Sequence, residues 1–155
     1  MSSCTHIESC NETEGDSRPQ LETTCFACGR DNPYGLQVSY RVIKPGSVHA
    51  EWCPGNQYSG FGGIVHGGIV STALDEAMAK AIVSTDTQGL TCELKVRFHH
   101  SVHPGDELRV DGWIVERKRR MIKTEASVCD EGGREVAHAW AVFLVENGTK
   151  PHHAW

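Results

Sequence analysis

Residues 63–80 read GIVHGGIVSTALDEAMAK, and this stretch decides the fold because its apolar residues recur with the spacing of a helix. One stripe of a helix spanning residues 67 to about 84 would carry Val70, Ala73, Leu74, Ala77, Met78 and Ala81. An apolar stripe of this kind buries itself against a sheet or another helix. No other segment predicts a long helix, so the sequence indicates one central helix.

Strand-like segments lie on both sides of this helix. Two of them precede it, LQVSYRVI (36–43) and SVHAEWC (47–53), separated by the turn KPG. Four more follow, at about residues 90–100, 107–118, 121–130 and 134–145. In the first of these four, strict alternation predicts the apolar residues at even positions 90–98 on one face and Thr91 with the charged residues on the other. The order predicts an α+β fold, a curved antiparallel sheet of about six strands wrapped around one helix.

Composition sets the broad class of the protein. A chain of 155 residues has the length of one domain, and its net charge of −5 gives no broad electrostatic reason to bind nucleic acid. The first twenty residues have no apolar core of the signal-peptide type, and no run approaches a membrane span. We therefore expect a cytoplasmic protein with no membrane partner. Its domain should span residues 21–148, between a flexible tail at 1–20 and a short tail at 149–155.

Two adjacent acids in the opening stretch have different expected roles. Asp75 lies roughly 150° around the helix from the centre of the apolar stripe, at about 100° per residue. Its helical neighbours there, including Thr72, are small, which leaves room for a ligand or another chain. Glu76 stands four residues before Lys80, the spacing of an ion pair on an exposed helix face. Asp75 is the candidate for chemistry, and a solvated polar residue is its alternative.

Two glycines begin the predicted helix. Gly67 and Gly68 stand where free backbone N–H groups and the positive end of the helix dipole can meet a carbonyl oxygen. Glycine also lets a ligand approach closely, so the pair has the elements of an oxyanion hole. A tight turn packed against a strand requires glycine as well, and the tripeptide HGG alone does not decide between the two.

Several stretches together resemble one known family. CFACGRDNPYGL (25–36), the opening stretch, GLTCELKVRF (89–98) and DEGGREVAHAWAVFLV (130–145) are similar to the hotdog-fold acyl-CoA thioesterases, in the branch of the phenylacetate-pathway thioesterases. The resemblance covers roughly residues 25–146. It implies a curved sheet around one helix, dimers or tetramers of dimers, and hydrolysis of the thioester of coenzyme A or a related pantetheine carrier. It implies no cofactor beyond the coenzyme A of the substrate.

The resemblance also implies roles for single residues. Asp75 matches the family's acid, which acts as nucleophile or as general base on water. Gly68 matches the glycine whose backbone N–H is the oxyanion donor, with Gly67 beside it. His66 matches the histidine before the glycines, a turn or orienting residue. Thr91 stands where some members carry a hydroxyl that positions water, although a β-branched strand residue would equally stand there.

The spacing of the acid and the glycine implies a second copy of the chain. Gly68 and Asp75 are seven residues apart, about 10 Å along a helix axis, so they cannot both touch one thioester carbon. If two helices run antiparallel across a two-fold axis, Gly68 of one copy comes close to Asp75 of the other. The sequence therefore predicts an obligate dimer with shared active sites.

Substrate contacts are expected from a loop and from basic groups. Some members of the family use a polar residue ahead of HGG, for which Asn56 and Gln57 are the nearest candidates. The phosphates of coenzyme A need cations, and a basic run, Arg117–Arg120 followed by Lys123, lies between two strands. A solvated turn explains this run equally well, and the alternative contacts are Arg97, His99 and His100. The substrate-binding candidates are Asn56, Arg97, His99, Arg119 and Arg120.

Cys25 and Cys28, followed by Gly29, match half of a zinc knuckle. A tetrahedral structural site needs four ligands, and no second CxxC exists. The ligands that would complete it, Cys4, His6 and Cys10, fall in the predicted tail. The family branch that the chain resembles often carries this cysteine pair, so we interpret the pair as structural and expect no metal.

Three other functions compete with thioester hydrolysis. An enoyl-CoA hydratase with a hotdog fold has a motif to which DNP (31–33) is superficially similar, but the histidine expected shortly after it is missing. A non-catalytic acyl-CoA-binding protein is distinguished only by a turnover assay. A cysteine-based redox enzyme is disfavoured, because CFACG does not lie between a strand and a helix. The sequence does not indicate which acyl group is bound.

Overall fold

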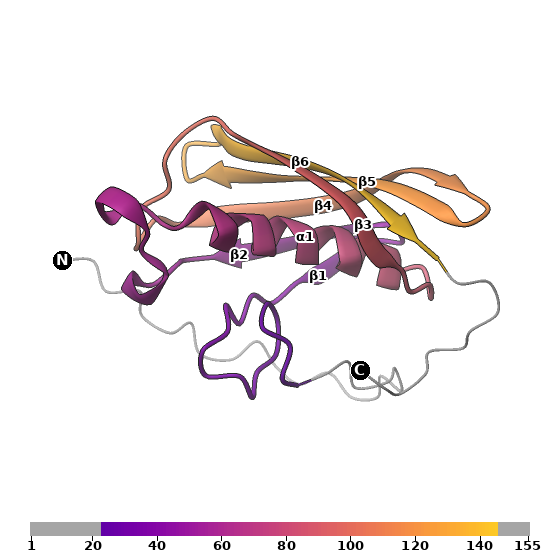
Figure 1. Cartoon of the computed structure of the whole chain (residues 1–155), viewed down its shortest axis with the longest axis horizontal. Helices are drawn as coiled ribbons and strands as arrows, with labels where there is room; N and C mark the ends of the chain where they lie inside the picture. Colours follow the sequence, from indigo (N-terminus) through magenta and orange to yellow (C-terminus); the bar gives the residue numbers. More distant parts are fainter. Residues whose placement is uncertain (1–22, 146–155) are drawn as a thin grey trace.

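The helix α1, Gly67–Val83, lies along one face of an antiparallel sheet (Figure 1). The computed structural model describes residues 23–145, so the tails predicted at 1–20 and 149–155 lie outside the described residues. Every residue of the predicted apolar stripe is buried, and Ile82 is buried with them. Over residues 23–145, no helix is long and apolar enough to cross a membrane.

Six strands form one open sheet, and each hydrogen-bonded pair of neighbours is antiparallel. The strands are β1 (Arg41–Lys44), β2 (Ser47–Trp52), β3 (Leu90–Phe98), β4 (Leu108–Lys118), β5 (Met121–Asp130) and β6 (Glu135–Leu144). Their spatial order is β1-β2-β4-β5-β6-β3. Two short 3₁₀ turns, η1 (Asn56–Tyr58) and η2 (Phe61–Gly63), connect β2 to α1. The predicted α+β class and strand count are confirmed, and β3, which follows the helix, forms an edge of the sheet.

The first predicted strand is shorter than expected. Residues 36–40 were predicted to be extended in the sheet, but β1 begins only at Arg41. The backbone N–H groups of Leu36 and Val38 donate instead to Phe26 O and Ala27 O, at 2.7 and 2.9 Å. Leu36 and Val38 are nevertheless buried. This segment therefore folds onto residues 23–35, here called the cysteine loop, in which Cys25 and Cys28 lie beside Glu76 of α1. The loop lies on the side of α1 away from β5 and β6 (Figure 1).

The alternation predicted for β3 is wrong at its start, because the strand contains a bulge. Thr91 pairs with the buried Phe143, the register then shifts at Cys92, and Leu94 pairs with the buried Ala141. An extra residue in one strand reverses the faces on either side of it. Thr91 therefore shares the helix-facing side with Leu94, although strict alternation places them on opposite faces.

The helix and the sheet make their closest approach where α1 crosses β4. A Cβ atom added at Gly112 would lie 2.5 Å from Ala77 O and 2.6 Å from its carbonyl carbon. No real Cβ tolerates such a distance from backbone atoms, so a larger residue at position 112 forces the helix away from the sheet. Gly112 thus allows α1 to pack close to β4. The distance between helix and sheet in turn fixes the position of the residues on the outer face of α1.

We expect Gly112→Ala to lower the free energy of unfolding by about 2–3 kcal/mol, because overpacking a tight contact typically costs 1–3 kcal/mol. Urea denaturation at equal protein concentrations measures the difference. The matched control is Gly132→Ala, an exposed turn position where an added Cβ meets only a side-chain oxygen at 3.4 Å. It should change stability by less than about 0.5 kcal/mol. Equal stability of the two variants would contradict the close contact.

Candidate active site

Asp75 lies in the middle of α1 and contacts the edge strand. Its carboxylate Oδ1 accepts a hydrogen bond from the Thr91 hydroxyl at 2.9 Å. This contact depends on the bulge, which turns Thr91 toward the helix. Burial raises the pKa of the Asp75 carboxyl, the Thr91 hydroxyl lowers it in part, and the charge of Glu76 raises it. The structure therefore brings together the acid and the hydroxyl that the sequence singled out.

The neighbouring acid faces another part of the molecule. Glu76 Oε1 lies 3.4 Å from Lys80 Nζ, which confirms the predicted ion pair, but the helix face predicted to be exposed is half-buried here. Glu76 also lies beside the thiols of Cys25 and Cys28 in the loop that covers this side of the helix. Adjacent helical residues point about 100° apart, so only Asp75 reaches Thr91.

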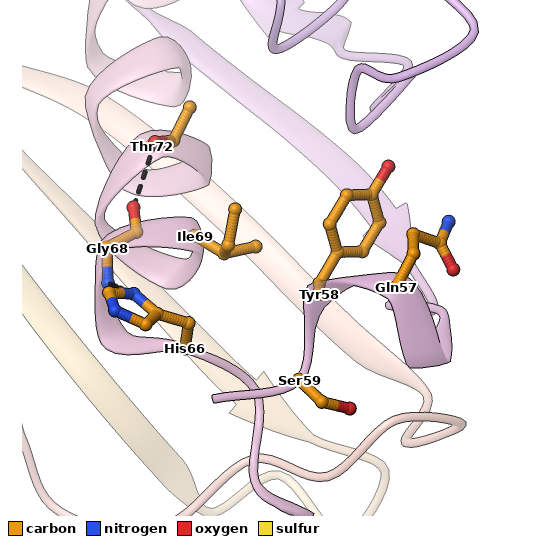
Figure 2. Close-up of a pocket in the computed structure, with 7 residues that line it drawn as sticks. All are labelled: Gln57, Tyr58, Ser59, His66, Gly68, Ile69 and Thr72. Carbon is orange, nitrogen blue, oxygen red and sulfur yellow. Dashed lines mark hydrogen bonds between the residues drawn. The ribbon is translucent and has the colours of Figure 1, made fainter. Parts of the chain in front are cut away.

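The N-terminus of α1 is capped by its own histidine. His66 is the N-cap residue, and its Nδ1 accepts a hydrogen bond from the Gly68 backbone N–H at 2.9 Å (Figure 2). The amide for which the sequence implied an oxyanion role therefore already has an acceptor. No acceptor among residues 23–145 is present for the Gly67 N–H, which is the first of the helix.

A pocket of about 400 Å³ opens beside this N-terminus (Figure 2). It lies between the 3₁₀ turn after β2 and the first turns of α1. Its lining residues are Gln57, Tyr58, Ser59, His66, Gly68, Ile69 and Thr72. None of these side chains is an acid, and Asp75 is not among them. The pocket in one chain thus lies at the helix start but lacks the carboxylate.

Some lining residues were not predicted as site residues. Of the two loop candidates, Gln57 lines the pocket and Asn56 does not. Thr72 follows Gly68 by one helical turn, and its hydroxyl donates to Gly68 O at 2.9 Å, as the dashed line in Figure 2 marks. Tyr58 is buried, and its hydroxyl donates to Gly35 O. Helical spacing predicts Thr72, four residues after Gly68, and Ile69, three residues after His66. The buried position of Tyr58 depends on tertiary packing.

The basic candidates are spread over the surface away from this pocket. Arg119 and Arg120 are exposed in the turn between β4 and β5, and neither forms an ion pair within the described part of the chain. Their neighbours Lys118 and Lys123 both pair with Glu116. His99 Nε2 lies 3.4 Å from Glu135, and Arg97 is exposed on β3 opposite His138. Within one chain the structure does not bring these groups to the pocket.

Comparison with known proteins identifies the family. Residues 62–137 match the thioesterase superfamily. A candidate esterase of Saccharolobus solfataricus is 25% identical over 116 residues, which are 74% of this chain and 77% of that protein. A thioesterase from Streptococcus pneumoniae, solved with coenzyme A, superposes with a TM-score of 0.67 at 20% identity, over 70% of this chain and 87% of its own. The PaaI protein from the phenylacetic acid degradation operon of E. coli has the same TM-score at 16% identity, over 70% of this chain and 83% of its own.

The antiparallel sheet packed on α1 has the fold of these solved structures, over 70% of this chain. Residues 62–137 therefore form a domain of the thioesterase superfamily, the family of hotdog-fold thioester hydrolases.

Proposed function

We propose that this protein hydrolyses acyl-CoA thioesters at a site formed by two copies of the chain, in which Asp75 of one copy meets the helix N-terminus of the other. One observation carries the proposal. The pocket beside Gly68 lies at the start of α1 and has no acid, and Asp75 lies seven residues further along the same helix. That separation is about 10 Å, too long for one thioester carbon to contact both groups.

The edge strand β3 supports the assembly. It spans nine residues and is exposed along nearly its whole length, and Leu90, Leu94 and Phe98 are its large exposed apolar side chains. A long, open and apolar edge is a template for pairing with another strand. Proteins rarely leave such an edge uncovered, and a second copy of the same strand covers it symmetrically.

Antiparallel pairing of β3 with its own copy explains how the half-sites meet. Near its start β3 carries Thr91, which binds Asp75. At its end Phe98 packs against the start of the helix, where a Cβ on Gly67 would lie 3.3 Å from Phe98 Cζ. Antiparallel pairing places the start of one strand beside the end of the other. Asp75 of each copy then approaches Gly67 of the second copy.

The chemistry uses these groups in a defined order. A backbone N–H at the helix N-terminus polarises the thioester carbonyl and stabilises the oxyanion. Asp75 takes a proton from water as the water oxygen attacks the carbonyl carbon, or its carboxylate attacks directly and the resulting anhydride is hydrolysed. The tetrahedral intermediate expels the coenzyme A thiolate, which needs little acid assistance. Thr91 holds the Asp75 carboxylate in position through its hydrogen bond.

We assign the first oxyanion contact to the Gly67 N–H rather than to the Gly68 N–H. The Gly68 N–H is bonded to His66 Nδ1, and a substrate oxygen would have to displace that ring. No acceptor among the described residues competes for the Gly67 N–H, which is the first of the helix. Gly68, which has no side chain, lets the substrate approach the helix backbone closely. When the His66 ring turns away, the Gly68 N–H becomes a second donor to the oxyanion.

Solved structures of one similar protein support the proposed roles of Asp75 and Thr91 and the proposed substrate. The Streptococcus pneumoniae thioesterase has been solved with an aspartate and, separately, a threonine replaced by alanine, and these two residues are sixteen positions apart. Asp75 and Thr91 have the same separation. That enzyme was also solved with coenzyme A, which supports an acyl-CoA substrate here. We further propose that Arg119 and Arg120, which have no acidic partner among the described residues, contact its phosphates.

Complementation between two inactive variants tests the shared site. One copy carries Asp75→Asn and lacks the acid, and the other carries Gly67→Pro and lacks the amide hydrogen. Each homodimer should be nearly inactive, whereas a mixed dimer has one intact site. Random mixing should restore about a quarter of wild-type activity, because half of the dimers are mixed and each has one working site of two.

Release of the coenzyme A thiol, followed over short, long and aryl acyl-CoA substrates, measures this activity. Differently tagged copies verify that mixed dimers form. Mixed dimers without activity would place the acid and the amide of each site in the same chain. Wild-type protein that binds acyl-CoA without releasing thiol would instead favour the non-catalytic binding protein.

A further inference from the structure

A second cluster of reactive side chains lies on another face of α1, around Glu76. The sulfur atoms of Cys25 and Cys28 and a carboxylate oxygen of Glu76 all lie within 4.8 Å of one another. All three residues are partly buried between the cysteine loop and α1. The geometry points to a zinc site with Cys25, Cys28 and Glu76 as protein ligands and water as the fourth.

The distances suit a tetrahedral zinc ion. Zinc binds sulfur at about 2.3 Å and carboxylate oxygen at about 2.0–2.2 Å, so its ligand atoms stand roughly 3.5–3.8 Å apart. The three atoms need to close by at most about 1.3 Å from their present separations, which are within 4.8 Å. Two thiolates also select zinc over magnesium or calcium, which prefer sites made of oxygen alone.

The cysteine loop holds both thiols on one side. The Gly29 N–H donates to Cys25 O at 2.8 Å, and the Asp31 N–H donates to Thr23 O at the same distance. A Cβ at Gly29 would lie 2.5 Å from both Cys25 N and Thr23 O, so only glycine permits so tight a turn. The turn therefore positions the two sulfur atoms before any metal binds, which reduces the entropy cost of binding.

The charges around the cluster are compatible with a zinc ion bound by two thiolates and one carboxylate. Zinc with two thiolates and one carboxylate has a net charge of −1, and Lys80 Nζ, 3.4 Å from Glu76 Oε1, compensates it. One carboxylate oxygen can bind zinc while the other keeps its contact with Lys80. In the metal-free protein, burial raises the pKa of Cys28 to about 12, with a further contribution from its hydrogen bond to Glu76. Zinc displaces the thiol protons, so metal binding releases protons to solvent.

The site would fasten the cysteine loop to the helix that carries Asp75. The loop is held to the rest of the fold by Tyr58, whose hydroxyl donates to Gly35 O, and Tyr40 donates to Ala73 O at 2.7 Å. Glu76 is the point where a metal would join the loop to the centre of α1. The role is structural, and it does not depend on the thioesterase mechanism.

Metal titration of the full chain tests this site. After treatment with a chelator, the protein should take up a single zinc ion per chain and show a higher Tm. Cobalt in place of zinc should give thiolate-to-metal charge-transfer absorption and the intense visible bands of tetrahedral coordination. Cys25→Ser, Cys28→Ser and Glu76→Gln should each weaken zinc binding by at least about tenfold.

Two control variants sharpen the result. Cys92→Ser removes an exposed free thiol on β3 and should bind zinc as the wild type does. Asp75→Asn should also bind zinc normally, which separates failure of this site from failure of the proposed hydrolysis. Uptake no greater than that of a Cys25→Ser/Cys28→Ser double variant would overturn the proposal, as would unchanged affinity in Glu76→Gln. If a cysteine variant does not fold, the cobalt spectrum of the wild type still decides whether sulfur binds the metal.

Discussion

Replacing Asp75 by asparagine should lower kcat for acyl-CoA hydrolysis by about 10³-fold, within the range typical of losing a general base or nucleophile. The amide keeps the shape of the side chain and can still accept the hydrogen bond from Thr91. It can neither take a proton from water nor attack a carbonyl carbon. Binding of coenzyme A, which involves other parts of the site, should change little, so KM should stay within a few-fold of the wild type.

The same substitution should leave folding intact. Burial raises the pKa of the Asp75 carboxyl, which means that the folded protein disfavours its charged form. Removing the charge therefore costs no stability at neutral pH, and Tm should not fall. This separates a loss of chemistry from a loss of structure.

The matched control is Asp86→Asn, the same chemical change at an exposed position beyond the end of α1. Asp86 has a φ of +53°, a conformation that asparagine also adopts readily. Its kcat should equal that of the wild type. An unchanged kcat in Asp75→Asn, on any acyl-CoA that the wild type hydrolyses, would refute the assignment of Asp75.

Replacing Gly67 by proline should lower kcat by about 10²–10³-fold, the usual cost of removing one oxyanion donor. Proline is favoured at the first position of a helix, where its missing N–H breaks no helical hydrogen bond. His66, with φ −58° and ψ 132°, already has the extended conformation that the residue before a proline adopts. The substitution therefore removes the donor while the helix keeps its start.

Gly67→Ala is the control for the added bulk. Alanine introduces the same Cβ, 3.3 Å from Phe98 Cζ, but retains the N–H. The ratio of the two rates isolates the hydrogen bond from the steric contact with Phe98. Circular dichroism and Tm should agree between the two variants. Equal rates would exclude the Gly67 N–H, and the Gly68 N–H would then be the donor to test.

Local periodicity explains why so much of the fold follows from the sequence. The apolar stripe of α1 repeats every three or four residues, and the helix that it predicts, residues 67 to about 84, agrees with the observed Gly67–Val83. The ion pair between Glu76 and Lys80 depends only on helical spacing, and it forms. The outward position of Asp75 follows from the same geometry. These features concern residues within one or two turns of each other, so their distances are set by the helix itself.

Features that depend on the pairing register of the strands were not predicted from local periodicity. The bulge at Cys92 depends on how β3 pairs with β6, and it turns Thr91 toward Asp75. The short β1 arises because residues 36–40 bond to the cysteine loop instead of the sheet. Alternation along one strand carries no information about its partner, so neither feature is readable from periodicity.

By itself, then, the sequence determined the central helix, the number of strands and the acid that faces away from the core. Three contacts were decided only by the tertiary structure. The His66 ring accepts the Gly68 N–H, and Gly112 lies against the backbone of α1 at Ala77. Cys25 and Cys28 lie beside Glu76. The physical reason is the range of the interactions. Helical spacing fixes neighbours along the chain, whereas contacts between a loop, a helix and a sheet depend on how the whole core packs.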